Sequence, residues 1–193
     1  MRKTLEASVA TCILITILSF SLPQGWFKAG SQPKSYEMGI DKGAGPDGKN
    51  AATIKSLDSL ITGFGTLMQK CKAGKFQGKR IKMSGFVKTQ NVVNWAGLWL
   101  RVDQYGSQQP LAFDNMHDRP IKGNTDWKKY EITLDVPLNA SFIAFGALLE
   151  GTGQIWFDNL RFEIAEKQSR GNFSGDQQQD EGNSKPVNLD FEK

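Results

Sequence analysis

Apolar and polar residues alternate along the middle of this chain, which is the pattern of strands with one buried face. The clearest case is Ala96–Asp103 (AGLWLRVD), where Leu98 and its alternate neighbours face one way and Trp99 faces the other. The pattern predicts further strands at Tyr36–Asp41, Ala51–Ser56, Ile81–Lys88, Pro110–Asn115, Trp127–Val136 and Ser141–Leu149. Ser141–Leu149 is apolar on both faces, as in a central strand. Short strands at this spacing, separated by Gly, Pro and Asn turns, predict an all-β sandwich or barrel.

The segment Leu57–Cys71 carries two conflicting signals. Its apolar residues recur at helical spacing. Gly63 and Gly65 interrupt that pattern, and each costs a helix about 1 kcal/mol relative to Ala. We therefore predict a loop followed by a strand from about Phe64 to Gln69, with room for a helical turn near Ser56–Leu60.

The last regular stretch is Ile155–Glu163 (IWFDNLRFE), which follows Gly151-Thr152-Gly153. Its large apolar residues cannot all share one face of a strictly alternating strand. A β-bulge near Asp158-Asn159 would reconcile them, and it would turn Asp158 toward the rim of the sheet.

The two ends of the chain differ from its middle. Residues 1–22 place an apolar run behind Arg2 and Lys3, which is the anatomy of a signal peptide. A cleaved signal is our first interpretation, an uncleaved membrane anchor the second and a mispredicted start the third. The first two predict a secreted or membrane-anchored extracytoplasmic protein. The expected organisation is a signal or anchor at 1–23, a sandwich at 24–166, a disordered linker at 167–187 and a short strand at 188–193.

Composition narrows the function classes. The net charge of +4 is too small to indicate nucleic-acid binding. Cys12 lies in the apolar run and leaves Cys71 alone in the body, so neither a disulfide nor a Cys/His metal set is expected. His117 is the single histidine, and the acidic residues show no spacing that selects a catalytic pair. We therefore predict that the protein is not an enzyme.

Three motifs together resemble a known superfamily. They are GTGQIWFDNLRFE at 151–163, PDGKNAATI at 46–54, and GFVKT at 85–89 with WAGLWLRVD at 95–103. They are similar to the jelly-roll carbohydrate-binding modules, also called galactose-binding-like domains, over roughly Gly25–Ala165. The resemblance implies a two-sheet antiparallel β-sandwich that binds sugar without catalysis. It also implies a structural calcium at the sandwich rim, with Asp158 as one ligand.

The chain departs from that superfamily at its beginning. The opening N-x-x-F-E strand, which supplies another calcium ligand, is missing before Trp26. A similar NLDFE occurs instead at Asn188–Glu192. It either begins a truncated second repeat, which we favour, or folds back to supply the missing edge strand. The predicted metal ligands are therefore Asp158 and Glu192.

The candidate sugar site combines a flat aromatic surface with planar polar groups for hydroxyls. Its predicted residues are Trp99, Arg101, Asn115, Arg119 and Trp95. Alternatives stay open: Trp99 as core, the arginines as ion-pair partners of Asp103 or Asp118, and Asp158-Asn159 as a cap of the bulge.

The sequence thus predicts an extracellular, non-catalytic module that binds a polysaccharide or oligosaccharide on a concave sheet face. No nucleic-acid partner is expected, and membrane contact is expected only through the N-terminal segment. The alternative is a ligand-sensing or protein-interaction domain detached from a larger regulator or enzyme. A third candidate, a hydrolase, would need two carboxylates about 5–10 Å apart.

Overall fold

A computed structural model describes residues 20–167 and 184–193 of the chain. Most of the predicted signal or anchor segment and most of the predicted linker lie outside the described residues. The strands are β1 (Phe27–Gly30), β2 (Tyr36–Asp41), β3 (Ala51–Ser56), β4 (Phe64–Lys72), β5 (Lys79–Asp103), β6 (Ala112–Asp114), β7 (Ile121–Val136), β8 (Phe142–Glu150) and β9 (Gln154–Lys167). Two 3-10 turns, η1 (Pro33–Ser35) and η2 (Gly74–Phe76), complete the elements. Within the described ranges, no helix has the length and apolarity needed to cross a membrane.

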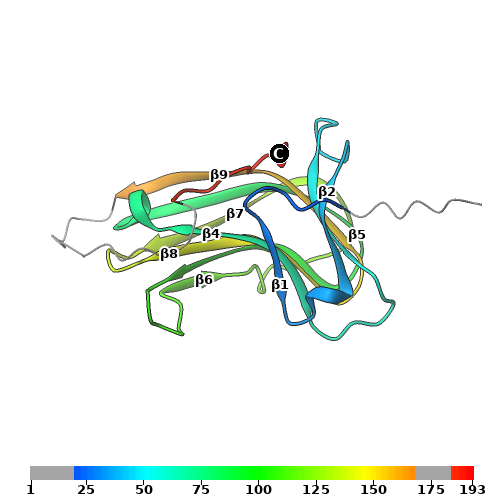
Figure 1. Ribbon diagram of the computed structural model, residues 1–193, viewed down its shortest axis with the longest axis horizontal. Helices are drawn as coiled ribbons and strands as arrows, with labels where there is room; N and C mark the ends of the chain where they lie inside the picture. Colours follow the sequence, from blue (N-terminus) through cyan, green and yellow to red (C-terminus); the bar gives the residue numbers. More distant parts are fainter. Residues whose placement is uncertain (1–19, 168–183) are drawn as a thin grey trace, which may run out of the picture.

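The strands pair antiparallel in the order β1-β4-β8-β5-β9-β3-β2, and β6 and β7 also pair with β5. β5 belongs to two layers, because residues 95–103 pair with β8 whereas residues 79–90 pair with β9. The first layer therefore contains β1, β4, β8, β6 and the second half of β5 (Figure 1). The second layer contains β2, β3, β9, β7 and the first half of β5. The all-β prediction is confirmed.

The core lies between these layers and follows the predicted alternation. Leu98, Leu100 and Val102 of β5 are fully buried, as are Ile143 and Phe145 of β8. Their outward neighbours on β8, Ala144 and Leu148, are also covered, as expected for a strand that is apolar on both faces.

Two local predictions were wrong. The separate strands expected at Ile81–Lys88 and Ala96–Asp103 are one strand, β5. Its register shifts between Val87 and Ala96 let it bend from one layer to the other without ending. No helical turn forms near Ser56–Leu60, and Leu60 is 87% exposed, so the helical spacing there does not mark a buried face. The loop followed by a strand from Phe64 is confirmed.

The predicted bulge in β9 is present. Ser84 pairs with Arg161 and Phe86 pairs with Asp158, so that two residues of β9 oppose one residue of β5. Asn159 in the bulge has φ of 53°. The Asp158 side chain, which we expected at an open rim, is only 2% exposed.

The C-terminal segment 187–193 folds back onto the sandwich and runs along β9 in Figure 1. Leu160 N donates to Leu189 O at 3.0 Å, beside the part of β9 that β3 leaves unpaired. The Phe191 ring is fully buried, with its centroid 5.0 Å from that of Trp26 and 5.1 Å from that of Phe157. This is the folded-back arrangement of the two that the sequence left open, although the segment forms a turn and no regular strand.

The residues that precede β1 are also hydrogen-bonded to the sandwich. Ile40 N of β2 donates to Ser21 O at 2.8 Å, so the end of the predicted signal segment lies against the edge of the second layer.

Candidate functional site

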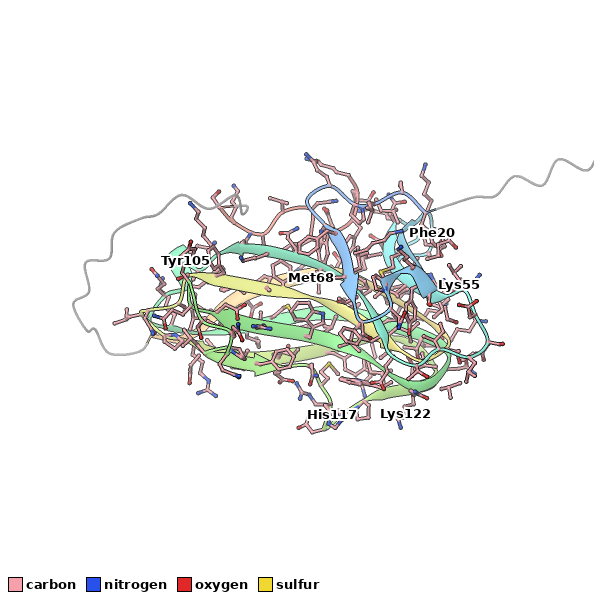
Figure 2. All side chains as sticks on the ribbon, turned by 60° about the horizontal axis from the view of Figure 1, so that its bottom comes forward. Phe20, Lys55, Met68, Tyr105, His117 and Lys122 are labelled. Carbon is pink, nitrogen blue, oxygen red and sulfur yellow. The ribbon has the colours of Figure 1, made fainter. Side chains whose placement is uncertain are left out.

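The outward side chains of the first layer form rows across the strands. One row, read from the strand pairing, runs from Phe27 on β1 through Met68 and Gly146 to Trp99 on β5. The next row runs from Lys70 through Ala144 and Arg101 to Phe113 on β6. We call this surface the outer face. Met68 and His117, both labelled in Figure 2, mark the face and the loop beside it.

A small apolar cluster covers the middle of the outer face. Trp99, Ala144 and Leu148 are buried there and pack with Met68 and Trp95, apart from the main core. Trp99 is on the predicted face but is only 7% exposed. Its indole Nε1 donates to the Thr66 hydroxyl at 2.8 Å, and that hydroxyl donates to a backbone carbonyl of β8.

More open aromatic rings surround this cluster. Phe113 is 50% exposed and is the cross-strand neighbour of Arg101. Phe27 and Phe64, on the far strands of the layer, are also exposed. A flat ligand therefore meets Phe113 more readily than Trp99, whose contribution is limited to the small exposed part of its ring.

The loop between β6 and β7 forms a wall at one end of the face. A Cβ added at Gly97 would lie 3.2 Å from the Met116 Cβ, so a side chain there would push the loop away by a few tenths of an ångström. His117 stands edge-on to Trp95, with ring centroids 5.2 Å apart. The Trp95 Nε1 is buried and has no hydrogen-bond partner within the described part of the chain.

The predicted rim residues brace that loop. The Arg119 guanidinium bonds to Asp114 at 2.7 Å and to Asp118 at 2.8 Å, and these bonds raise its pKa. Asn115 Oδ1 accepts from His117 N at 3.3 Å. The ion pair that the sequence left open for Arg119 is therefore formed, and its contact with a ligand stays a prediction.

Arg101 also forms the ion pair that the sequence left open as an alternative, because its Nε donates to Asp103 Oδ1 at 2.7 Å. The structure adds Lys70, which the sequence analysis missed and whose ammonium lies 3.8 Å from the centroid of the Phe142 ring. A usable signal was present, since Met68 and Lys70 alternate with the buried Leu67, Gln69 and Cys71 of β4. The sequence had grouped Trp99 and Arg101 in one site, but the position of Lys70 in the same row depends on how β4, β8 and β5 pair.

The surroundings of Asp158 bear on the predicted calcium. Burial, together with the nearby charges of Asp47, Glu192 and Asp190, raises the pKa of the Asp158 carboxyl to about 6. Asp158 accepts bonds from the backbone N and the Nδ2 of Asn159 at 2.6 and 2.9 Å. Asp158 therefore also caps the β-bulge, which is the alternative that the sequence left open.

Glu192, the second predicted ligand, is held near the turn that follows β2. Its carboxylate accepts from the backbone N of Asn50 at 3.1 Å and from its Nδ2 at 3.4 Å. Across residues 20–167 and 184–193, no group of three His, Cys, Asp or Glu side chains is arranged to hold a metal. The negative charge suits a cation, but an ion here would need backbone and amide oxygens beside these carboxylates.

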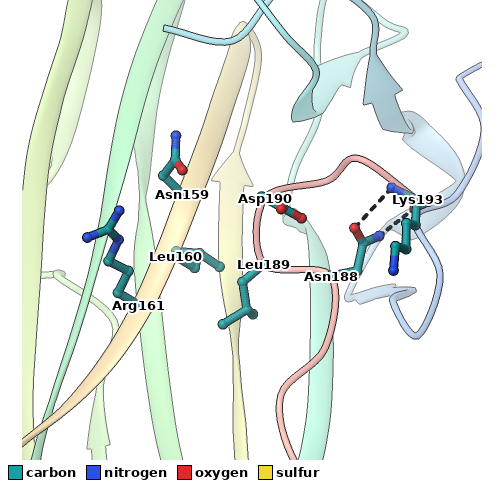
Figure 3. Close-up of a pocket in the computed structure, with 7 residues that line it drawn as sticks. All are labelled: Asn159, Leu160, Arg161, Asn188, Leu189, Asp190 and Lys193. Carbon is teal, nitrogen blue, oxygen red and sulfur yellow. Dashed lines mark hydrogen bonds between the residues drawn. The ribbon is translucent and has the colours of Figure 1, made fainter. Parts of the chain in front are cut away.

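Two hollows lie away from the outer face. One, of about 450 Å³, lies between β9 and the C-terminal segment and is lined by residues that include Arg161, Asp190 and Lys193 (Figure 3). The other, of about 500 Å³, lies among polar residues of the loops near Ser56, Asn91 and Thr152. Neither contains an aromatic side chain on which a sugar ring could stack.

Comparison with known proteins shows which solved structures share this architecture. No family model matches the chain. The xylan-binding domain CBM22-1 of Paenibacillus barcinonensis Xyn10C superposes with a TM-score of 0.54, at 13% identity, over 77% of this chain and 90% of that one. The chain has the fold of the jelly-roll carbohydrate-binding modules. A cyclase from Fischerella sp. TAU is also similar, with a TM-score of 0.50 and 17% identity over 77% of this chain and 89% of that one. At these identities the likeness shows the fold alone.

One curated relative is more similar in sequence. The uncharacterized HTH-type transcriptional regulator YbfP of Bacillus subtilis (strain 168) is 42% identical over 172 residues. The match covers 88% of this chain and 57% of the relative, so the chain spans little more than half of that protein's length.

Proposed function

We propose that this chain is a non-catalytic saccharide-binding module whose ligand lies along the outer face. The observation that carries the proposal is an apolar cluster on the solvent side of a sheet, bordered by exposed aromatic rings and by polar groups. Sugar rings present flat C–H faces and a rim of hydroxyls, and this combination matches both. The fold shared with a xylan-binding domain supports the same ligand class.

The proposed roles follow from position. Phe113 stacks on a sugar ring, and the cluster around Trp99 and Trp95 forms the floor. Arg101, Asn115 and Arg119 supply hydrogen bonds from the sheet and from the loop wall. The Trp95 Nε1 is buried below this floor, so the indole contributes its apolar ring and no hydrogen bond to the ligand.

The test is binding of the chain to a panel of oligosaccharides, followed by the Phe113→Ala variant. We expect the variant to lose at least tenfold in affinity and to keep its thermal stability, because half of the ring is already exposed. Leu60→Ala, an exposed apolar residue in a distant loop, is the control. Unchanged affinity in Phe113→Ala would remove the outer face as the site.

The sequence similarity to YbfP favours a second candidate function. A helix-turn-helix consists of helices, and the described residues contain no α-helix, so the similarity to YbfP runs through the sandwich. In this reading the same face senses a saccharide for a DNA-binding part. The test is DNA binding by full-length YbfP with and without the saccharide identified for this chain. No ligand effect there would leave the module without a regulatory role.

The two candidates differ in location. The apolar run at residues 1–22 supports a secreted or membrane-anchored protein, whereas a DNA-binding regulator acts inside the cell. Cell fractionation of the full chain distinguishes them: recovery outside the cytoplasm supports the extracytoplasmic module.

A structural calcium belongs to the same proposal. Asp158 and Glu192 would hold it, and its charge would relieve the repulsion among the carboxylates around Asp158. The ion would then join the C-terminal segment to β9 and to the turn near Asn50.

A further inference from the structure

We propose that the loop tip formed by Leu57, Leu60 and Val93 inserts into the surface of a lipid bilayer. Leu57 and Leu60 belong to the loop between β3 and β4, and Val93 belongs to the bend of β5. The inference goes beyond saccharide binding and uses a surface other than the outer face. It rests on the membrane-anchored form of the extracytoplasmic candidate.

The three side chains of the loop tip are exposed and lie close to one another. Leu57 is 60% exposed, Leu60 is 87% exposed and Val93 is 65% exposed. Asp58, Ser59 and Val93 line the same hollow of about 500 Å³, so the loop and the bend are neighbours. Single exposed apolar residues are ordinary, whereas several on one surface mark contact with a partner or a membrane.

The backbone of the loop tip is held in place by the sandwich. Leu57 N donates to Ser35 O at 2.9 Å, and Val93 N donates to Thr152 O at 3.0 Å. Ile61, in the same loop, is buried in the main core. The fold itself therefore presents the apolar side chains to solvent, and inserting them into a bilayer orders little additional chain.

The apolar run at residues 1–22 meets the sandwich near the loop tip. Phe20 N donates to Glu37 Oε1 at 3.3 Å, and Glu37 is the cross-strand partner of Lys55. Lys55 lines the hollow beside the loop tip, and Figure 2 shows Phe20 and Lys55 at one end of the molecule. An anchor formed by the apolar run would therefore hold the loop tip against the bilayer surface. This proximity favours a lipid surface over a protein partner.

The charge around the loop tip is balanced. Lys55 and Asp58 are the charged residues among those that line the hollow, and the others are neutral. Insertion would therefore be driven by burial of apolar area and not by attraction to anionic headgroups. We expect the contribution of the loop tip to be the same on neutral and anionic vesicles and to be insensitive to salt.

The first experiment reports the position of the loop tip in the full chain. Leu60→Cys and, as the control, Leu138→Cys are each labelled with an environment-sensitive fluorophore in a Cys12→Ala background. Leu138 is an exposed residue of the loop that precedes β8, whereas the turn that bonds to Val93 follows β8. Cys71 stays unlabelled, because it is fully buried and burial raises its pKa to about 12.

The two labels should respond differently to vesicles of phosphatidylcholine. We expect the fluorescence at position 60 to rise at least twofold and to be quenched by spin-labelled lipids. The fluorescence at position 138 should stay unchanged, because that loop lies at the opposite end of β8.

A second experiment measures how much the loop tip contributes to vesicle binding. The variant with Leu57→Ser, Leu60→Ser and Val93→Ser should bind the same vesicles at least tenfold more weakly than wild type. The control with Leu138→Ser and Ile164→Ser also removes exposed apolar side chains, and it should stay within twofold. Thermal unfolding of each variant excludes loss of folding as the cause.

Several outcomes would overturn the inference. Fluorescence that changes at both labelled positions or at neither would do so, as would vesicle binding that the triple variant keeps. A loss seen only on vesicles that contain phosphatidylglycerol would do so too, since charge would then explain it. A rise at position 60 with protein concentration and without lipid would overturn it by assigning the loop tip to a second copy of the chain. Saccharide binding is tested separately by Phe113→Ala, so either proposal can fail without the other.

Discussion

The Gln69 side chain on β4 binds both backbone groups of Val187: its Nε2 donates to the carbonyl at 3.0 Å and its Oε1 accepts from the amide at 2.8 Å. Gln69 is fully buried, on a strand whose other inward residues are apolar. A buried amide that points into a core needs partners, and the C-terminal segment supplies them. The segment is therefore part of the domain.

Gln69→Ala tests this attachment. The substitution leaves the Val187 amide and carbonyl without their partner, so we expect a loss of about 1–3 kcal/mol in the free energy of unfolding. Urea denaturation measures it, with the exposed Gln108→Ala as the matched control. A loss no greater than that of the control would mean that the contact contributes nothing to stability.

Phe191→Ala tests the packing of the same segment. The ring is fully buried against Trp26 and Phe157, and truncating such a ring typically costs about 3–5 kcal/mol. Lys193→Ala, two residues further and exposed, should change stability by less than about 0.5 kcal/mol. Equal stability of the two variants would show that the segment is not part of the core.

Asp158 predicts a pH dependence of stability. Burial raises its pKa in the folded protein from the ordinary 3.8 to about 6, so the folded state binds more protons than the unfolded state between these values. Stability should therefore fall as the pH rises from about 4 to about 6, by an amount on the order of 2–3 kcal/mol. Asp158→Asn removes this charge, and we expect the variant to be more stable than wild type at pH 7 in the presence of a chelator. Thermal melts across that pH range measure both.

Calcium bound at Asp158 should make wild type more stable than Asp158→Asn. An ion that binds only the folded state raises stability by about 2.7 kcal/mol at a hundredfold excess over its Kd. We expect calcium to raise the midpoint of wild type and to leave that of Asp158→Asn unchanged. An equal shift in both proteins, or none in either, would contradict a calcium site at Asp158.

A substitution at Trp95 should affect stability and saccharide affinity differently. Its Nε1 is buried without a partner in the described part of the chain, and such a group costs about 1–3 kcal/mol. Trp95→Phe removes the donor, so the free protein should be as stable as wild type or more stable. Because Nε1 is closed to solvent and a Phe ring keeps the floor apolar, the same variant should bind saccharide within about twofold of wild type. A variant that is less stable than wild type would show that the packing of the indole outweighs the cost of its unpaired Nε1.

The sequence by itself determined the all-β class, most of the strands and the bulge in β9. Strand periodicity is local, so the alternation in Ala96–Asp103 was enough to place Trp99 and Arg101 on one face. The large apolar residues of Ile155–Glu163 required the bulge for the same reason. Motif similarity pointed to the jelly-roll fold that the solved structures share.

Only the tertiary structure decided what stands beside these residues. Phe113 lies beside Arg101, and Lys70 lies two strands away in the same row, because β4, β8, β5 and β6 pair in a particular register. Register depends on partners far apart in the chain. Asp158 is buried, and Phe191 completes the core, because the C-terminal segment returns across the sandwich. The motif at Asn188–Glu192 left that return as the less favoured of two alternatives, because the contacts that stabilise it exist only once both layers have formed.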